Sequence, residues 1–310
     1  MRETSQALII TVNFRQDECT RRFLSSAAKL DSFPRCHFLI VDNNSNDDSV
    51  SSLLSASDGF VNVELLASPQ NEGYFGAARR ALRRYLEAHS LPDWVLVCNN
   101  DIVFDDPTFL AQLLERNPDA VGVIAPAIVS GITGYDENPS ISHRPNQLRM
   151  WRYRFWLSNY YLMWFKQWLS PLVRKIRYRF RERTTAAGNG NRSAVYAPSG
   201  AMIIFGRRFF EAGGFIDDGA FLYAEEFRVA EMCRQLRLPV IHDPGLRVWH
   251  QGSQSTGRLL TRNVFLHQKR SFTYALTRYN TSYPELRTSL QRISTAIPKI
   301  ESRPAGDRIR

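Results

Sequence analysis

Five short apolar runs recur through the first 130 residues, and their spacing limits the folds open to this chain more than any other feature. Helical patterns lie between them, over 17–30 and over 76–88. Apolar strands that alternate with helices favour a parallel sheet covered on both faces. We therefore predict an α/β fold with a mostly parallel sheet flanked by helices. The expected strands are ALIITVN (7–13), HFLIVDN (37–43), VNVELLA (61–67), WVLVCNND (94–101) and VGVIAPAIV (121–129).

Polar side chains follow several of these runs at the point where the strand should end. Asn13 closes the first run, residues 42–45 close the second, and residues 99–101 close the fourth. In open α/β sheets, ligands bind outside the carboxyl ends of the strands. These side chains are therefore expected to line one binding site.

The sequence Asn99-Asn100-Asp101 is the first candidate for chemistry. A hard divalent cation such as Mg²⁺ is usually held by one or two carboxylates together with substrate phosphates. One aspartate at a strand end, helped by an asparagine, is enough for that arrangement. The alternative is a polar turn, or a cap for the helix expected after Pro107.

Two loops carry features that suit a nucleotide. Asp42, at the end of the second strand, could accept hydrogen bonds from a base or ribose, and an Asx turn at 42–45 is compatible with that role. In NEGYFGAARR (71–80), Gly73 and Gly76 permit close backbone approach, and the following helix N-terminus favours an anion.

The pair Glu225 and Glu226, in FLYAEEFRVAE, is the candidate for acid–base chemistry. Adjacent side chains on a helix point about 100° apart, so one carboxylate can line a cleft while the other faces away. A single carboxylate suits a general base better than a two-acid hydrolase site. The alternative is a solvated acidic helix face. His250, beside small polar residues, is a candidate metal or phosphate contact, with a structural histidine as its alternative.

A basic aromatic segment accounts for the net charge of the chain. Residues 144–183 hold eleven Lys and Arg residues and one acid, which equals the net charge of +10, and 151–168 contain nine aromatic residues. Such a local concentration indicates an attachment site rather than nucleic-acid binding. A bilayer interface selects this combination of residues, whereas polar interruptions within 155–173 argue against a spanning helix. We predict contact with an anionic membrane surface; packing on the sheet or self-association is the alternative.

The remaining features indicate an intracellular globular protein. The chain is 44% apolar and 23% charged, its four cysteines show no metal or redox spacing, and its start lacks a signal-peptide layout. We expect a helix over 258–279, a mobile linker at 184–193, and a frayed end beyond Pro284.

Taken in order, these segments resemble a family 2 glycosyltransferase of the GT-A fold, over about 7–130 and 195–257. The motifs are IITVNF, VDNNSND, NEGYFGAARR, LVCNND, YAPSGAMIIFGRRFFEAGGFIDDGAFLYAEE and HDPGLRVWHQGSQST. The resemblance implies Asp101 as metal ligand, His250 on the metal or diphosphate, Glu226 as the base and Glu225 as the reserve choice. It also implies a set of nucleotide-sugar contacts: Asn13, Asp42, Asn44, Asn71, Gly73, Arg79, Asn99 and Asn100.

The chain is similar, within that family, to bacterial rhamnosyltransferase-like members, but it departs from their common form E-[DE]-x-D-L-x-x-R. Arg228 and Met232 stand at the later Asp and Arg positions, so the usual support of the base is expected to be absent. Ala230 and Glu231 match a subgroup with EE followed by A-E. Arg79 stands late in the segment NEGYFGAARR, where such proteins often have an asparagine. This departure bears on the donor sugar more than on the reaction.

The resemblance implies an inverting, metal-dependent hexosyltransferase that uses Mg²⁺ or Mn²⁺. Its donor would be a UDP- or dTDP-linked sugar, and its acceptor a glycan or polyprenyl-linked glycan of bacterial surface polysaccharide. It would work in the cytoplasm, peripherally on the inner face of the cell membrane. The alternative is a non-catalytic scaffold of a polysaccharide complex. A nucleotidyltransferase is disfavoured because residues 7–20 contain no glycine.

The predicted organisation has four parts. The catalytic GT-A domain combines two stretches, a nucleotide-binding half and an acceptor half, and the basic aromatic insertion separates them. A C-terminal helix and a flexible basic tail follow. The boundaries are 1–139 and 194–257 for the catalytic domain, 140–193 for the insertion, 258–283 for the helix and 284–310 for the tail.

Overall fold

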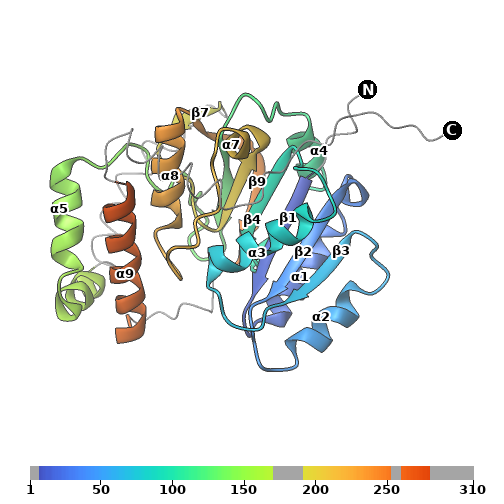
Figure 1. The fold of residues 1–310 in the computed structure, drawn as a ribbon, viewed down its shortest axis with the longest axis horizontal. Coiled ribbons are helices and arrows are strands. Elements are labelled where there is room, and N and C mark those ends of the chain that lie inside the picture. Colours follow the sequence, from blue (N-terminus) through green and yellow to red (C-terminus); the bar gives the residue numbers. More distant parts are fainter. Residues whose placement is uncertain (1–6, 170–190, 253–259, 280–310) are drawn as a thin grey trace.

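The structure is a computed structural model that describes residues 7–169, 191–252 and 260–279. Within these ranges, nine strands form one sheet in the order β3-β2-β1-β4-β8-β6-β9-β5, and β7 pairs with β9 (Figure 1). The strands are β1 (Ala7–Asn13), β2 (Cys36–Asp42), β3 (Val63–Ala67), β4 (Trp94–Asn99), β5 (Ile102–Val103), β6 (Val123–Ser130), β7 (Ser193–Val195), β8 (Met202–Gly206) and β9 (Val240–His250).

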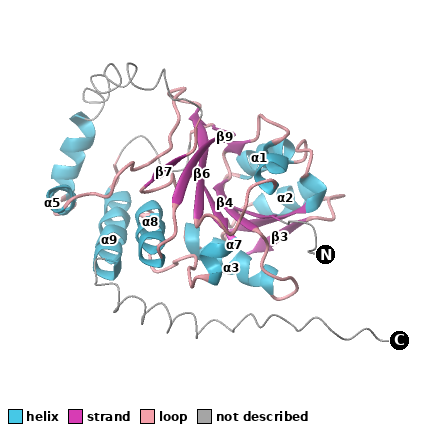
Figure 2. Cartoon of the chain, turned by 90° about the horizontal axis from the view of Figure 1, so that it is seen from above, coloured by secondary structure: helices cyan, strands magenta, loops and turns pink. Residues whose placement is uncertain are grey.

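Helices cover both faces of this sheet. Figure 2 shows α1 and α2 on one face and α3 and α7 on the other. The described helices are α1 (Asp17–Ala27), α2 (Ser49–Ser57), α3 (Tyr74–Leu86), α4 (Phe109–Leu114), α5 (Gln147–Trp156), α7 (Arg207–Glu211), α8 (Glu225–Leu236) and α9 (Arg262–Tyr279), with helical residues at 160–169 and a 3₁₀ turn at Phe33–Arg35.

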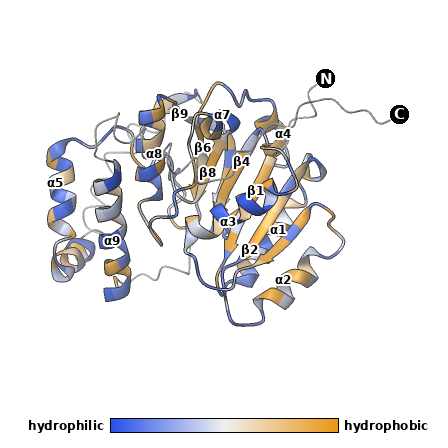
Figure 3. Cartoon of the chain, in the orientation of Figure 1, coloured by the Kyte–Doolittle hydropathy of each residue, from blue (hydrophilic) through white to orange (hydrophobic). Residues whose placement is uncertain are grey.

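The apolar runs are continuous because β1 is buried on both sides. Ile9 packs in the core under α1, together with Phe23. Leu8 and Ile10 point the other way and pack under α3, against Phe75. Figure 3 shows the strands as the most hydrophobic part of the fold. The two-sided burial confirms the α/β fold predicted from the sequence.

Strand direction changes halfway across the sheet. The first four strands, β1 to β4, pair in parallel, as the helical connections predict. β8 then runs antiparallel to β4 and to β6, while β6 and β9 are parallel. β5 and β7 add antiparallel edges to β9. The sheet is therefore parallel in its first half and mixed in its second.

The described part of the basic aromatic segment forms a pair of helices, broken at 157–159, and its residues from 170 onward lie outside the described ranges. Helix α5 begins at its cap Asn146, whose side chain accepts a hydrogen bond from the Arg149 backbone N–H at 2.9 Å. Both helices pack on α9, through Leu157 and Phe265 among others. α9 in turn packs on α8 through Ala275 and Phe227. The expected linker 184–193 lies mostly outside the described residues, and the tail 284–310 lies wholly outside them.

Candidate active site

A cleft of about 470 Å³ opens at the carboxyl ends of β1 and β4, and we call it the central cleft. It gathers side chains from distant parts of the chain, as the strand-end pattern predicted. Its polar lining comprises Asn43, Asn71, Asn99, Asn100, Asp101, Glu137, Ser199, Glu225, Glu226 and His250.

The two-residue strand β5 brings Asp101 and His250 together. It pairs Ile102 with His250 at the end of β9, and the Gln251 N–H donates to the Asp101 carbonyl at 3.1 Å. The Asp101 side chain is buried, and its Oδ1 lies 3.1 Å from His250 Nε2. On the other side of the ring, His250 Nδ1 lies 2.9 Å from Glu137 Oε2. Although burial favours the neutral ring, the hydrogen bonds with Asp101 and Glu137 raise the pKa of His250 to about 10.

This constellation fits a divalent cation. Apart from the 3.1 Å contact between them, the carboxylate oxygens of Asp101 and the Nε2 of His250 are buried without a hydrogen-bond partner, and such atoms are costly to bury unless a ligand satisfies them. Within the described residues no three carboxylate, imidazole or thiol groups are placed so that they could hold a metal ion together. A cation here would therefore take its remaining ligands from water and substrate phosphates, which is usual for Mg²⁺.

Glu226 sits at the start of α8, after two residues in left-handed conformation, Tyr223 (φ 73°) and Ala224 (φ 63°). Its Oε1 accepts a hydrogen bond from the Gly200 N–H at 3.3 Å. A Cβ at Gly200 would lie 3.0 Å from that oxygen, so a larger residue at this position would crowd the Glu226 carboxylate. Burial raises the pKa of Glu226, which makes its carboxylate a stronger base.

Glu225 is held differently. Its Oε1 lies 3.6 Å from Arg228 Nη2 and makes no hydrogen bond. Burial, followed by the charge of Glu226, raises the pKa of Glu225. Both carboxylates line the central cleft, so the helix geometry does not turn Glu225 away from it. Only Glu226 also lines a second cavity described below.

Arg228 places a cation beside the acidic pair, 3.6 Å from Glu225, at a position where the common motif has an aspartate. Its side chain is fully buried and stacks over the Phe75 ring at 5.3 Å. Its Nη1 donates to the Asp217 carbonyl at 2.5 Å. Asp217 also accepts hydrogen bonds from Tyr274 at 2.9 Å and Tyr279 at 2.5 Å, both on α9. Arg228 thus lies between Glu225 and Asp217, the residue that accepts the hydrogen bonds from α9.

The loop before α3 is tied to two neighbours. Asn43 Nδ2 donates to Asn71 Oδ1 at 2.9 Å, and Asn43 Oδ1 accepts from the Glu72 N–H at 2.9 Å. Gly73 has φ 74°, and a Cβ there would lie 2.1 Å from the Phe221 carbonyl oxygen. This close approach lets the loop pack on residues just before Glu225, which joins the two halves of the cleft.

Three predicted nucleotide contacts serve the internal structure here and do not line the cleft. Asn13 is fully buried and donates to Asp42 Oδ1 at 2.8 Å. Asp42 also accepts from the Ser45 N–H and hydroxyl at 3.1 and 2.5 Å. Asn44 occupies a left-handed turn, with φ 62°. Asn100 does line the cleft, but its amide donates to Thr20 Oγ1 at 3.0 Å, towards α1.

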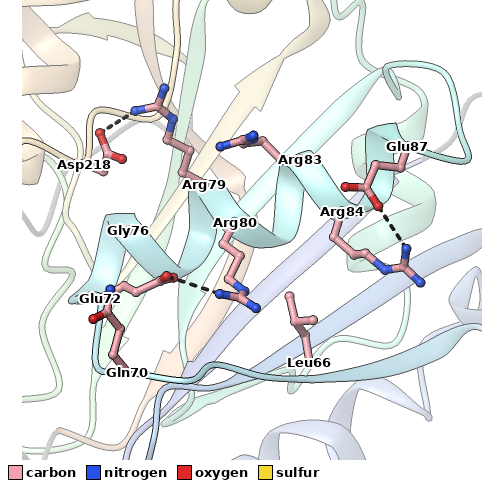
Figure 4. A pocket seen from close by; sticks show the side chains of 10 residues that line it. All are labelled: Leu66, Gln70, Glu72, Gly76, Arg79, Arg80, Arg83, Arg84, Glu87 and Asp218. Atoms are coloured by element: carbon pink, nitrogen blue, oxygen red, sulfur yellow. Dashed lines mark hydrogen bonds and ion pairs between the residues drawn. The ribbon is translucent and has the colours of Figure 1, made fainter. Parts of the chain in front are cut away.

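Arg79 is not placed in the central cleft. It lies on the outward face of α3 and pairs with Asp218, beside a separate cavity of about 550 Å³ (Figure 4). The helix turns this face away from the sheet, since Phe75 and Ala78 occupy the inward face. Arg79 thus lines a different cavity from the other predicted contacts, and its contact with the nucleotide sugar stays a prediction.

Sequence analysis missed three residues that shape the site. Glu137 and Tyr74 line the cleft, and the Tyr74 hydroxyl donates to the Gly200 carbonyl at 3.2 Å. Burial raises the pKa of Tyr74 well above its usual range. Arg228 was seen only as a departure from a motif. The sequence signal that could have indicated its role is an arginine placed among glutamates on one helix.

Comparisons with known proteins agree with this arrangement. The model of "Glycosyl transferase family 2" matches residues 8–184. Two Mycobacterium tuberculosis strains each contain a protein named N-acetylglucosaminyl-diphospho-decaprenol L-rhamnosyltransferase. Each is 23% identical over 88% of this chain and 84% of the relative.

Solved structures show the same fold at low identity. GalNAc-T7 with UDP, GalNAc and Mn²⁺ has a TM-score of 0.55 and 12% identity; the match covers 99% of this chain and 53% of that one, so this chain spans about half of its length. The mannosyltransferase PcManGT from Pyrobaculum calidifontis, with GDP-Man and Mn²⁺, has a TM-score of 0.50 and 13% identity, over 99% and 77% of the two chains.

Proposed function

This chain belongs to glycosyl transferase family 2, and from that premise we propose that it moves a sugar from a nucleotide diphosphate sugar to a hydroxyl of a lipid-linked glycan, with inversion at the anomeric carbon. One observation carries the proposal. A buried carboxylate suited to a metal ion, Asp101, and a carboxylate suited to a general base, Glu226, line the same cleft.

The proposed chemistry divides between these groups. Asp101 and His250 would hold a divalent cation, which would supply charge stabilisation for the departing diphosphate. Glu226 takes the proton of the acceptor hydroxyl as its oxygen bonds to the anomeric carbon. The bond between that carbon and the phosphate oxygen breaks, and its electron pair leaves with the diphosphate. Glu137 fixes the orientation of His250 through Nδ1.

The substrate classes are inferred from the relatives. The mycobacterial proteins are named for L-rhamnose transfer to a diphospho-decaprenol-linked N-acetylglucosamine, which supports a polyprenyl diphosphate acceptor here. The UDP- or dTDP-linked donor is our proposal, and the nucleotide panel below tests it. Mn²⁺ accompanies the nucleotide in two structures of the same fold, which supports Mn²⁺ or Mg²⁺ as the cation.

Replacement of Asp101 with Asn is expected to abolish metal-dependent donor binding, because a neutral amide is a poor ligand for a hard cation. For wild-type protein, a saturating nucleotide sugar with Mn²⁺ should raise the melting temperature by about 5–10 °C. The measurement is a thermal-shift panel of UDP-, dTDP- and GDP-sugars, with and without Mn²⁺.

The matched control for this panel is Asp105→Asn, which removes an exposed carboxylate close by in the sequence, 3.5 Å from Arg247. It should respond like wild type. A shift of equal size in Asp101→Asn, or in the absence of metal, would contradict the proposed site. Metal-dependent donor binding without any turnover would instead identify a non-catalytic relative.

The proposed attachment to a membrane surface rests on the exposed aromatic side chains of α5 and of 160–169. Trp151 and Trp168 are 62% and 65% exposed, and Phe155, Tyr161, Trp164 and Phe165 are also exposed. Among the described helices, none has the length and apolar character needed to cross a bilayer. Exposed rings beside Arg and Lys residues suit a headgroup layer with anionic lipid. This arrangement supports peripheral binding to the inner face of the cell membrane.

Replacement of Trp151 and Trp168 with Ser is expected to weaken binding to vesicles containing anionic lipid by about tenfold or more per residue, since burial of one large apolar side chain contributes about 1.5–3 kcal/mol. Cosedimentation with phosphatidylglycerol vesicles measures the effect. Leu54→Ser, which removes a side chain 56% exposed on α2, is the control and should bind like wild type. Equal binding by the double variant and wild type would reject this surface.

A further inference from the structure

Two further cavities extend from the central cleft towards the basic aromatic helices. The first, which we call the inner cavity, has a volume of about 320 Å³ and shares Tyr223 and Glu226 with the central cleft. The second, the outer cavity, has about 420 Å³ and shares Arg149, Tyr153, Trp156 and Lys166 with the inner one. The three cavities therefore lie next to one another, from the proposed base to the surface of α5, and we call this series the path.

Positive charge gathers where the inner and outer cavities meet. Arg149 and Lys166 line both cavities, and Arg152 lines the outer one. Burial, followed by the charge of Arg152, lowers the pKa of Lys166. Within the part of the chain that the structure describes, none of the three forms an ion pair, and Glu226 is the one acid on either lining. Among the described residues, these cations thus have no counter-charge.

The arginine-rich cavity beside α3 shows the contrast. Its arginines have acidic neighbours: Arg79 pairs with Asp218, Arg80 with Glu72, and Arg84 with Glu87 (Figure 4). Three of the four arginines that line it are therefore already neutralised. Arginines that already pair with acids offer a ligand little positive charge. Arg149, Arg152 and Lys166, on α5 and 160–169, keep their charge for one.

Aromatic rings form the walls around these cations. Lys166 Nζ lies 5.9 Å from the ring centres of both Tyr153 and Trp156, and Arg149 lies 5.9 Å from that of Tyr153. These contacts hold the cations over apolar surface, where water competes less for their donors. The same two helices carry the exposed aromatic side chains that we assign to the membrane surface. A ligand along this path would therefore meet the polar central cleft first, then the cations, and last the exposed aromatic side chains.

We propose that Arg149, Arg152 and Lys166 bind the diphosphate of the lipid-linked acceptor, with its sugar in the inner cavity and one sugar hydroxyl at Glu226. The proposal rests on the proposed glycosyl transfer and names the subsite that selects a diphosphate. Arginine and lysine donors match phosphate oxygens through charge-assisted hydrogen bonds. The polyprenyl chain leaves along the exposed aromatic side chains of the same helices.

The test uses farnesyl diphosphate as a probe and needs no turnover. Trp156 lies on both cavities, so binding is followed by calorimetry and by tryptophan fluorescence. Wild type should bind farnesyl diphosphate, bind farnesyl monophosphate more weakly, and bind farnesol and inorganic pyrophosphate weakest. Arg149→Gln and Lys166→Gln should each weaken farnesyl diphosphate binding by about tenfold or more, the value of one charge-assisted hydrogen bond.

Arg154→Gln is the matched control, because Arg154 lies on the same helix, is exposed, and lines neither cavity. It should bind the probe like wild type. Equal binding of farnesyl mono- and diphosphate, equal affinity in Arg149→Gln and Arg154→Gln, or tight binding of pyrophosphate alone would overturn the proposal. Phosphatidylglycerol vesicles that displace the probe completely would assign the cations to a phospholipid headgroup and overturn it too.

A separate measurement distinguishes this failure from failure of the proposed function. Nucleotide-sugar and Mn²⁺ thermal shifts report the central cleft, and they should be the same in wild type and Arg149→Gln. Absence of those shifts in wild type would reject the transferase proposal itself. Normal donor shifts combined with loss of selectivity for diphosphate would reject only the acceptor subsite.

Discussion

Glu226→Gln is expected to lower kcat by about 10²–10⁴-fold, the usual contribution of a general base. Glutamine keeps the shape of the side chain, and its carbonyl oxygen can still accept the hydrogen bond from the Gly200 N–H. It cannot take up the acceptor proton. Nucleotide-sugar binding should be unchanged, since the loss concerns a group that acts in the transition state. Steady-state kinetics with a thermal shift on the same sample provide the test.

Glu225→Gln is the control for that variant, and we expect it to lower kcat by less than about tenfold. Reversal of the two results would make Glu225 the base. The pH dependence gives a second check. A base must be deprotonated, and burial raises the pKa of Glu226, so kcat should fall as pH drops through a value above the usual glutamate range of about 4.3. Glu226→Gln should lose this limb of the profile.

Arg228→Met is expected to destabilise the fold by about 3–5 kcal/mol, the usual cost of removing one partner from a buried ion pair. Methionine keeps much of the apolar stem that packs over Phe75. The Asp217 carbonyl loses its hydrogen bond from Nη1, and Glu225 loses its nearest cation. Chemical denaturation monitored by circular dichroism measures the change in the free energy of unfolding.

Arg22→Met is the comparison, because Arg22 forms an exposed pair with Glu18 on α1. Exposed pairs contribute about 0–1 kcal/mol, so this variant should remain near wild-type stability. Similar losses in the two variants would mean that the network around Arg228 contributes no special stability. A stable Arg228→Met protein with normal kinetics would also show that Glu225 does not depend on this arginine.

The alternation of apolar runs was enough to predict the α/β fold, because it follows from burial on both faces of each strand. It could not predict that β8 enters antiparallel between β4 and β6. Direction depends on how the chain returns from the long excursion between β6 and β8, and the local pattern is the same either way. Helix α9 was predicted over 258–279 and is observed over Arg262–Tyr279.

The site residues also fall into a group that the sequence predicted and a group that it missed. Asp101, Glu225, Glu226 and His250 were predicted, and the structure brings them to one cleft, although their chemical roles stay predictions. Glu137 was missed because it lies in a turn without periodicity and meets His250 across 113 positions of sequence. Arg79 lies on the outer face of α3 because Phe75 and Ala78 occupy the face that packs on the sheet. The motif alone did not specify which face each residue takes. Long-range contacts of this kind leave no local pattern.

The hydrogen bonds from Tyr274 and Tyr279 to Asp217 also bear on the order in which the protein forms during synthesis. The parallel half of the sheet lies within the first 99 residues and can collapse while the rest of the chain is still being made. The loop that precedes the acidic pair receives two of its hydrogen bonds from the last described helix. These two hydrogen bonds can form only after the ribosome has released residues up to 279, so a nascent chain would complete the parallel half of its sheet well before the loop in front of Glu225.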